Sequence, residues 1–201
     1  MTGTTRTRPV AVLGRVRPAV PVLGSAVAAI VLLAVLTLAQ HGGEVPLFTT
    51  HLVVLLLAAG PAYLLDDTAA DVTAVVPRSL LHRRLVIVAN GVLVSAVAWG
   101  AVVLLLAWRS PSLPLWALTW ETAGLIWIGL AASAVVFRHG INEPGNQVGS
   151  ALGLVVVGVL VAQRLLPFPV LVTANDGPAR AGWWAITIGA AFATFVIASR
   201  E

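Results

Sequence analysis

The chain has 201 residues, of which 59% are hydrophobic and only 10% are charged, and its formal net charge is +4. With a mean hydropathy of +0.97, these few charges cannot cover the apolar surface of a water-soluble domain, so lipid must surround most of the chain. The absence of cysteine excludes disulfides, thiolate metal sites and thiol nucleophiles.

The basic character of the chain indicates membrane orientation and not nucleic-acid binding. Its twelve basic residues are all arginines, which are scattered at the ends of apolar runs without interleaved surface aromatics. If the N-terminus lies inside, nine arginines fall on inner segments and three on outer ones. The excess predicts a multi-pass protein of the inner (plasma) membrane with both termini in the cytoplasm.

Residues 1–17 form a basic segment ahead of the first apolar run. Residues 10–16 mix apolar side chains with arginine between two prolines, which predicts a short amphipathic helix on the inner membrane surface. A disordered basic tail is an equal alternative. Because five more apolar runs follow, we expect the first run to be a retained helix and not a cleaved signal.

Residues 18–201 are predicted to form one all-α integral membrane domain of six transmembrane helices. A helix needs roughly 20 apolar residues to cross a bilayer core of ~30 Å. Five apolar runs of this length lack Asp, Glu, Lys and Arg, and a sixth contains only Glu121. The six runs are 18–39, 45–65, 85–108, 110–137, 145–163 and 181–199.

Tryptophans support the same orientation. An indole at the membrane interface buries its ring and hydrates its N–H, so tryptophans gather there. The residues expected near the outer interface are Trp108, Trp116, Trp120, Trp183 and Trp184.

The inner connection 66–84 is longer than two helices need. Val72, Val75 and Val76 lie on one side of a helix, an acidic or hydroxyl side chain at its start can cap it, and Pro77 ends it. The pattern predicts a small amphipathic helix presented to the cytoplasm between the second and third spans.

The acidic start of this connection allows a second interpretation. Asp66, Asp67 and Asp71 resemble the acidic cluster with which prenyl-diphosphate enzymes hold magnesium. Those enzymes usually have a second acidic cluster, which this chain lacks, so we favour acids that stabilise a helix start. A membrane-embedded, magnesium-dependent enzyme of lipid phosphates or prenyl diphosphates stays as an alternative.

Two ionisable residues and one deep tryptophan are candidates for a substrate path. Glu121 lies within a span, where an ionisable group is costly enough to indicate a substrate or proton-relay role. It also lies only about a turn from the outer interface, beside Trp120, so we favour a water-exposed acid. His51 lies at a similar depth and is judged in the same way. Trp127 lies deeper.

The sequence offers no sign of a metal site, a cofactor or an ATPase. The four histidines lie in different segments without ligand spacing. A chain without lysine cannot contain the phosphate-cradling loop and its lysine. We therefore expect no enzyme activity from the chain itself, and any ATP hydrolysis belongs to a partner.

The outer connection 165–180 is apolar in its first half. Pro167 and Pro169 should end the fifth helix and turn the chain back toward the outer leaflet, which predicts a re-entrant hairpin between the fifth and sixth spans.

This organisation resembles the membrane subunit of an ATP-binding-cassette (ABC) exporter, of the small six-helix actinobacterial type encoded apart from its ATPase. In that family an interfacial helix, a coupling helix and an outer hairpin take the places of residues 10–16, 66–84 and 167–176. The stretch LLDDTAADVTAVVPRSLLHRR, the NEPG at 142–145 and the ASR at 198–200 also resemble such subunits.

The resemblance implies a permease that forms the export path for an unknown substrate. Its partners would be a cytoplasmic ABC ATPase, a second copy or related permease, and the lipid bilayer, but no nucleic acid. A noncatalytic scaffold or a small secondary transporter is the other alternative. The implied ATPase-coupling residues are Asp66, Asp67, Asp71, Val72, Val75, Val76, Pro77, Arg78, Arg83 and Arg84.

Overall fold

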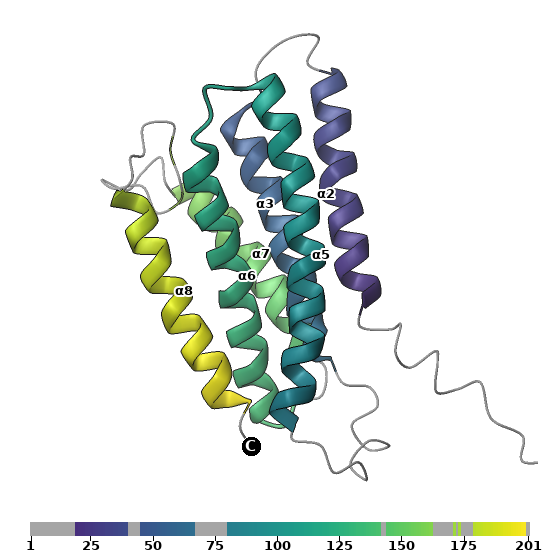
Figure 1. Cartoon of the computed structure of the whole chain (residues 1–201), viewed down its shortest axis with the longest axis vertical. Coiled ribbons are helices and arrows are strands. Elements are labelled where there is room, and N and C mark those ends of the chain that lie inside the picture. The colour runs from purple at the N-terminus through teal and green to yellow at the C-terminus, as the bar shows by residue number, and fades with distance from the viewer. Residues whose placement is uncertain are drawn as a thin grey trace, which may run out of the picture.

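A computed structural model describes residues 19–39, 45–66, 80–141, 144–162, 171, 173 and 179–199, with the backbone alone for 19, 39, 80–83 and 179–180 (Figure 1). Within these ranges the chain forms six α-helices and one 3₁₀ turn, without strands. The elements are α2 (Ala19–Ala39), α3 (Leu47–Ala62), η1 (Tyr63–Leu65), α5 (Leu80–Arg109), α6 (Leu115–Arg138), α7 (Pro144–Ala162) and α8 (Ala179–Ala198).

All six helices are long and apolar enough to cross a membrane, which confirms the predicted six-helix membrane class. Each predicted apolar run corresponds to one helix, and α3 continues directly into η1. Helices form here because a bilayer core offers no water to backbone N–H and C=O groups, which must pair within the segment.

Successive helices run in opposite directions along the bundle (Figure 1). We call the end that is at the bottom in Figure 1 the lower end and the opposite one the upper end. The start of α2 and the end of α8 both lie at the lower end, as an even number of spans requires. The end of η1, the starts of α5 and α7 and the end of α6 lie there too.

Two helices form the centre of the bundle. In α3 and α6, 61% and 56% of the membrane-spanning residues are buried, against 22–33% in the other four helices. The central pair packs together, with α2 and α7 against α3, and α8 against α6. Groups that must be shielded from lipid therefore have their place along α3 and α6.

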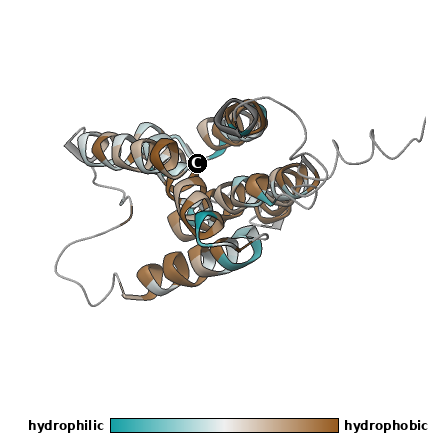
Figure 2. Cartoon of the chain, turned by 90° about the horizontal axis from the view of Figure 1, so that it is seen from below, coloured by the Kyte–Doolittle hydropathy of each residue, from teal (hydrophilic) through white to brown (hydrophobic). Residues whose placement is uncertain are grey.

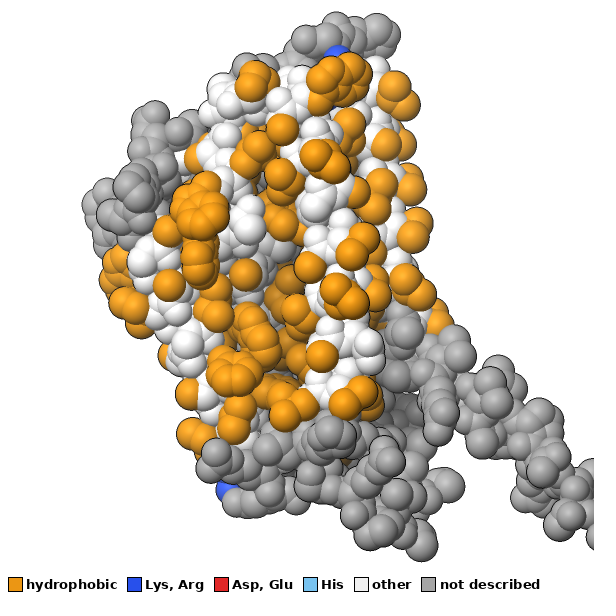
Figure 3. All heavy atoms as spheres, in the orientation of Figure 1, with side chains coloured by type: hydrophobic (Ala, Val, Ile, Leu, Met, Phe, Trp, Pro, Cys, Tyr) orange, Lys and Arg blue, Asp and Glu red, His pale blue; other side chains and the backbone are white. Residues whose placement is uncertain are grey.

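The outside of the bundle is apolar along its length. Large hydrophobic side chains such as Leu38, Leu104, Leu154 and Ile186 are more than 70% exposed. On the face shown in Figure 3, described arginines are visible only at the two ends. Figure 2, viewed from the lower end, shows apolar residues on every helix. Such a surface is suited to lipid and not to water.

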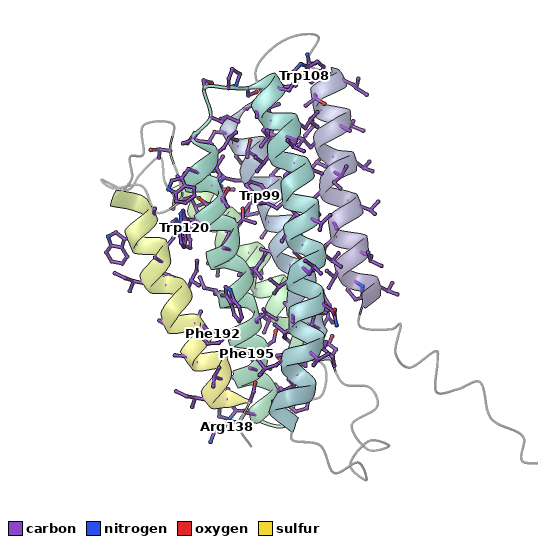
Figure 4. The ribbon with its side chains drawn as sticks, viewed as in Figure 1. Trp99, Trp108, Trp120, Arg138, Phe192 and Phe195 are labelled. Carbon is purple, nitrogen blue, oxygen red and sulfur yellow. The ribbon has the colours of Figure 1, made fainter. Side chains whose placement is uncertain are left out.

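The five tryptophans predicted near the outer interface lie at the end of α5 and near the starts of α6 and α8. The N–H of Trp120 is buried and Trp184 is 9% exposed, so for these two the predicted hydration of the indole is wrong. Trp108, Trp116 and Trp183 are 76%, 64% and 74% exposed, and Figure 4 labels Trp108 at the upper end. Such a group of tryptophans is typical of a membrane–water interface.

Hydrogen bonds between helix ends also hold the upper end together. Ser110 Oγ accepts a bond of 2.7 Å from the backbone N–H of Val45, which joins the end of α5 to the start of α3. The Arg109 guanidinium donates to the Thr37 carbonyl at 2.9 Å, near the end of α2. These bonds satisfy groups that helix ends would leave unpaired.

The α6–α8 contact depends on one glycine. A Cβ built on Gly124 of α6 would lie 2.3 Å from the Trp184 ring of α8, so the indole rests directly on the helix backbone. At Gly100, by contrast, an added Cβ meets nothing within 4 Å.

We predict that Gly124→Ala destabilises the protein by about 1–3 kcal/mol, because the ring must move away from its packed position. Gly100→Ala, which adds the same methyl group to an open helix face, should be neutral or slightly stabilising. Unfolding by SDS in mixed micelles measures both. Equal effects of the two substitutions would contradict this account of the α6–α8 contact.

Candidate functional site

The two ionisable residues that the sequence places inside spans form a buried pair. The Nδ1 atom of His51 in α3 lies 2.9 Å from Oε1 of Glu121 in α6. His51 is 3% exposed and Glu121 is fully buried. The prediction of water-exposed side chains at Glu121 and His51 is therefore wrong. The acid faces the neighbouring helix because α6 occupies the centre of the bundle and not its edge.

A threonine lies next to each residue of the pair, and each threonine hydroxyl donates to a backbone carbonyl four residues earlier in the chain. Thr50, next to His51, is fully buried, and its hydroxyl lies 3.4 Å from the Pro46 carbonyl. Thr122, next to Glu121, donates to the Leu118 carbonyl at 2.7 Å. Such bonds satisfy hydroxyl groups inside a membrane helix, so neither threonine donates its proton to the His51–Glu121 pair.

Burying ionisable side chains inside a membrane costs free energy, so the presence of the pair indicates a functional role. An ionised group inside a membrane is tolerated when it has a partner and is shielded from lipid. Acids and histidines buried between membrane helices are the residue types that form proton relays and substrate sites in transporters.

A second polar contact joins the same two helices near the lower end. The hydroxyl of Ser133 in α6 is fully buried and donates to the Ala62 carbonyl of α3 at 2.9 Å. The α3–α6 interface is therefore fastened near both ends, by Ser133 below and by the His51–Glu121 pair above. Sequence reasoning did not single out Ser133, because a serine within an apolar run has no distinctive pattern.

Trp127 does not belong to the His51–Glu121 pair. Its ring lies in edge contact with Phe192 and Phe195 of α8, at centroid distances of 5.1 and 6.1 Å. The candidate path of His51, Glu121 and Trp127 is thus divided between two helix interfaces, α3–α6 and α6–α8. Figure 4 labels Phe192 and Phe195 on α8.

The predicted coupling segment is described at its two ends, and each end contacts another span. At its start, Oδ1 of Asp66 accepts a hydrogen bond of 2.6 Å from the backbone N–H of Gly145, in the first turn of α7. A carboxylate at a helix start is favoured by the helix dipole and by unpaired N–H groups. Gly145 permits the approach, because an added Cβ would lie 2.6 Å from the Cα of Tyr63.

At the other end of the segment, the Arg84 side chain of α5 is 9% exposed. Its guanidinium carbon lies 4.3 Å from the ring centroid of Phe137, in the last turn of α6. A cation over an aromatic face is attracted by the ring quadrupole, more strongly where water is excluded. Arg84 thus connects the start of α5 to the end of α6.

The middle of the segment falls outside the described residues, as do residues 10–16 and most of 165–178. The coupling helix, the interfacial helix and the re-entrant hairpin therefore stay predictions. Within the described ranges, no group of three or more His, Cys, Asp or Glu side chains is placed to hold a metal. The predicted coupling residues that the structure does not describe are Asp67, Asp71, Val72, Val75, Val76, Pro77, Arg78 and the Arg83 side chain.

Comparisons of the chain with models of protein families, with curated proteins and with solved structures find no match.

We predict that His51→Leu and Glu121→Leu each destabilise the protein by about 1–3 kcal/mol, because each removes the polar contact between α3 and α6. The double variant should lose about 0.5–1.5 kcal/mol less than the sum of the two single losses, the coupling that double-mutant cycles give for polar contacts between membrane helices. Unfolding in SDS mixed micelles measures all three variants.

Ser133→Ala, which removes the contact near the other end of the α3–α6 interface, provides the control. Combined with His51→Leu, it should give additive losses, because the two sites share no partner. Additive losses in the His51–Glu121 cycle itself would show that the pair makes no energetic contact.

Proposed function

We propose that the chain is the permease subunit of an ABC exporter, which forms the path for a substrate while a separate cytoplasmic ATPase supplies the energy. The observation that carries the proposal is the attachment of both ends of the 66–84 segment to other spans. Asp66 is bonded to α7 and Arg84 lies on α6. A simple connector between η1 and α5 would need neither contact.

These contacts supply a route by which force on the segment reaches the bundle. An ATPase that moves the segment displaces Asp66, and with it the first turn of α7. It also displaces Arg84, and with it the last turn of α6 beside Phe137. Movement of α6 against α3 in turn acts on the His51–Glu121 pair at the upper end, because those two helices carry it.

The substrate path is proposed to lie between two subunits. The centre of a single bundle is filled, because α3 and α6 pack directly against each other with side chains such as Leu57, Leu118 and Leu130 almost wholly buried. A second copy or a related permease would supply the other wall. Separation of α3 from α6 during transport would expose the carboxylate of Glu121 to the passing substrate or to a proton.

The ATPase contact is proposed to be the apolar side of the predicted coupling helix, formed by Val72, Val75 and Val76. We predict that the tagged protein, purified from its native membrane in mild detergent, brings down a stoichiometric cytoplasmic ATPase. Val75→Asp combined with Val76→Asp should abolish that recovery, because the charges cannot enter an apolar groove.

Ala74→Asp is the matched control, because successive helical residues are ~100° apart and residue 74 lies on the opposite side of the predicted helix. It adds one aspartate, as either Val75→Asp or Val76→Asp does alone, and should leave the ATPase bound. Membrane insertion of every variant is checked by its recovery in the membrane fraction. Recovery of the protein without an ATPase, while a known ABC complex survives the same procedure, would refute the proposal and favour the magnesium enzyme or the scaffold.

A further inference from the structure

One side of α5 is turned away from the rest of the bundle. The residues Val88, Val102 and Leu106 are almost wholly buried, because this side of α5 packs against α2, α3 and α6. The opposite side of the helix carries large hydrophobic residues that are exposed. These residues are Val86, Leu93, Val97 and Leu104. In a single copy of the chain, only lipid would cover them.

A polar residue lies on the same exposed side. Asn90 is exposed, and residues 85–89 below it are all apolar. The span Arg84–Arg109 has 26 residues, so it is about 39 Å long. It exceeds a hydrocarbon core of ~30 Å by about 5 Å at each end. The backbone of Asn90, about 9 Å above that of Arg84, therefore lies within the core. We call Val86, Asn90, Leu93, Val97 and Leu104 the outer face of α5.

The Asn90 amide has more hydrogen-bonding groups than its own helix uses. Its Nδ2 donates to the Val86 carbonyl at 2.9 Å, which is the single hydrogen bond of this side chain within the described part of the chain. An asparagine amide has two N–H donors and a carbonyl acceptor. One N–H and Oδ1 are therefore left over, and lipid tails cannot bond to them.

The exposed threonines of α8 differ from Asn90 in this respect. Thr187 and Thr194 each have one hydroxyl proton, and each donates it to a carbonyl of its own helix. Such a threonine can face lipid with its donor satisfied. An asparagine cannot satisfy its whole amide in the same way, so Asn90 needs a partner outside its helix.

We propose that the outer face of α5 binds the same face of a second copy of the chain, with the two Asn90 side chains hydrogen-bonded to each other. Each amide has one donor and one acceptor left over, so two identical amides satisfy each other through two reciprocal bonds. All copies enter the membrane in the same orientation, so a two-fold axis between two of them is perpendicular to the membrane. Asn90 then lies at the same depth in both copies.

The spacing of the outer face suits a pair of parallel helices. Asn90, Val97 and Leu104 recur every seven residues, and Leu93 lies between the first two. A seven-residue repeat forms the seam of a left-handed helix pair, which is the usual crossing of membrane helices. One asparagine in such a seam fixes the register of the two helices. The pairing deepens the proposed function, on which its role in transport rests, because it names the helix that joins two permeases.

Energy transfer between donor-labelled and acceptor-labelled copies of the purified full chain tests the proposal. The copies are reconstituted at decreasing protein-to-lipid ratios in vesicles of phosphatidylethanolamine and phosphatidylglycerol. Asn90→Leu removes both leftover groups and should weaken pairing about three- to tenfold, the effect of one or two hydrogen bonds between membrane helices. Asn90→Gln keeps an amide and should restore most of the pairing. Asn146→Leu, which removes an exposed asparagine of α7, is the matched control and should leave pairing unchanged.

Disulfide cross-linking provides an independent measurement, because the chain has no cysteine of its own. In the proposed pair, residue 93 of each copy lies beside the two-fold axis. Leu93→Cys should therefore form a cross-linked dimer when native membranes are oxidised. Leu154→Cys replaces an exposed leucine of α7 and should stay monomeric.

Three outcomes would overturn the proposal. They are a monomeric protein at the highest density in the vesicles, equal weakening by Asn90→Leu and Asn146→Leu or by neither, and equal cross-linking of the two cysteine variants. The vesicles contain no ATPase, so their result is independent of the ATPase recovery that tests the proposed function. A melting curve close to that of the wild type confirms that each variant is folded.

Discussion

The structure depends on one constraint, which is that lipid offers no hydrogen bonds. Backbone groups pair within six helices, and the side chains obey the same rule. Threonines on lipid-facing helices bond to their own backbone, as Thr187 does to Trp183 and Thr194 to Ala190. The polar contacts between α3 and α6, made by Ser133 and by the His51–Glu121 pair, lie at the centre of the bundle, where neighbouring spans shield them from lipid.

This concentration of polar contacts on α3 and α6 connects the two ends of the bundle. At the upper end these helices hold the His51–Glu121 pair. At the lower end, α3 continues through η1 to Asp66. The last turn of α6 carries Phe137, whose ring lies against the Arg84 guanidinium. The groups with proposed roles in coupling and in the substrate path are therefore joined by the most buried part of the molecule.

The sequence predicted the fold well, because a membrane span is a property of a single segment. Six apolar runs became six helices, and the tryptophans came together at one end. The depth of His51 and Glu121 was also evident, and their similar distance from one interface was the signal that could have paired them. The direction in which Glu121 points from α6 was predicted wrongly. Helix α6 is apolar on all sides, so nothing in its pattern showed that Glu121 points at α3 and not at water. Close approaches such as Asp66 to Gly145 likewise depend on which helices become neighbours.

Coupling of the 66–84 segment to a cytoplasmic ATPase requires the lower end of the bundle to face the cytoplasm. The absence of cysteine makes single-cysteine labelling a direct test. The sites are two exposed residues, with Pro111→Cys at the upper turn after α5 and Asn146→Cys near the start of α7. A membrane-impermeant maleimide should label Pro111→Cys in intact cells or spheroplasts and Asn146→Cys only after permeabilisation. The reverse pattern would place the coupling segment outside, where no ATPase could reach it, and would contradict the account.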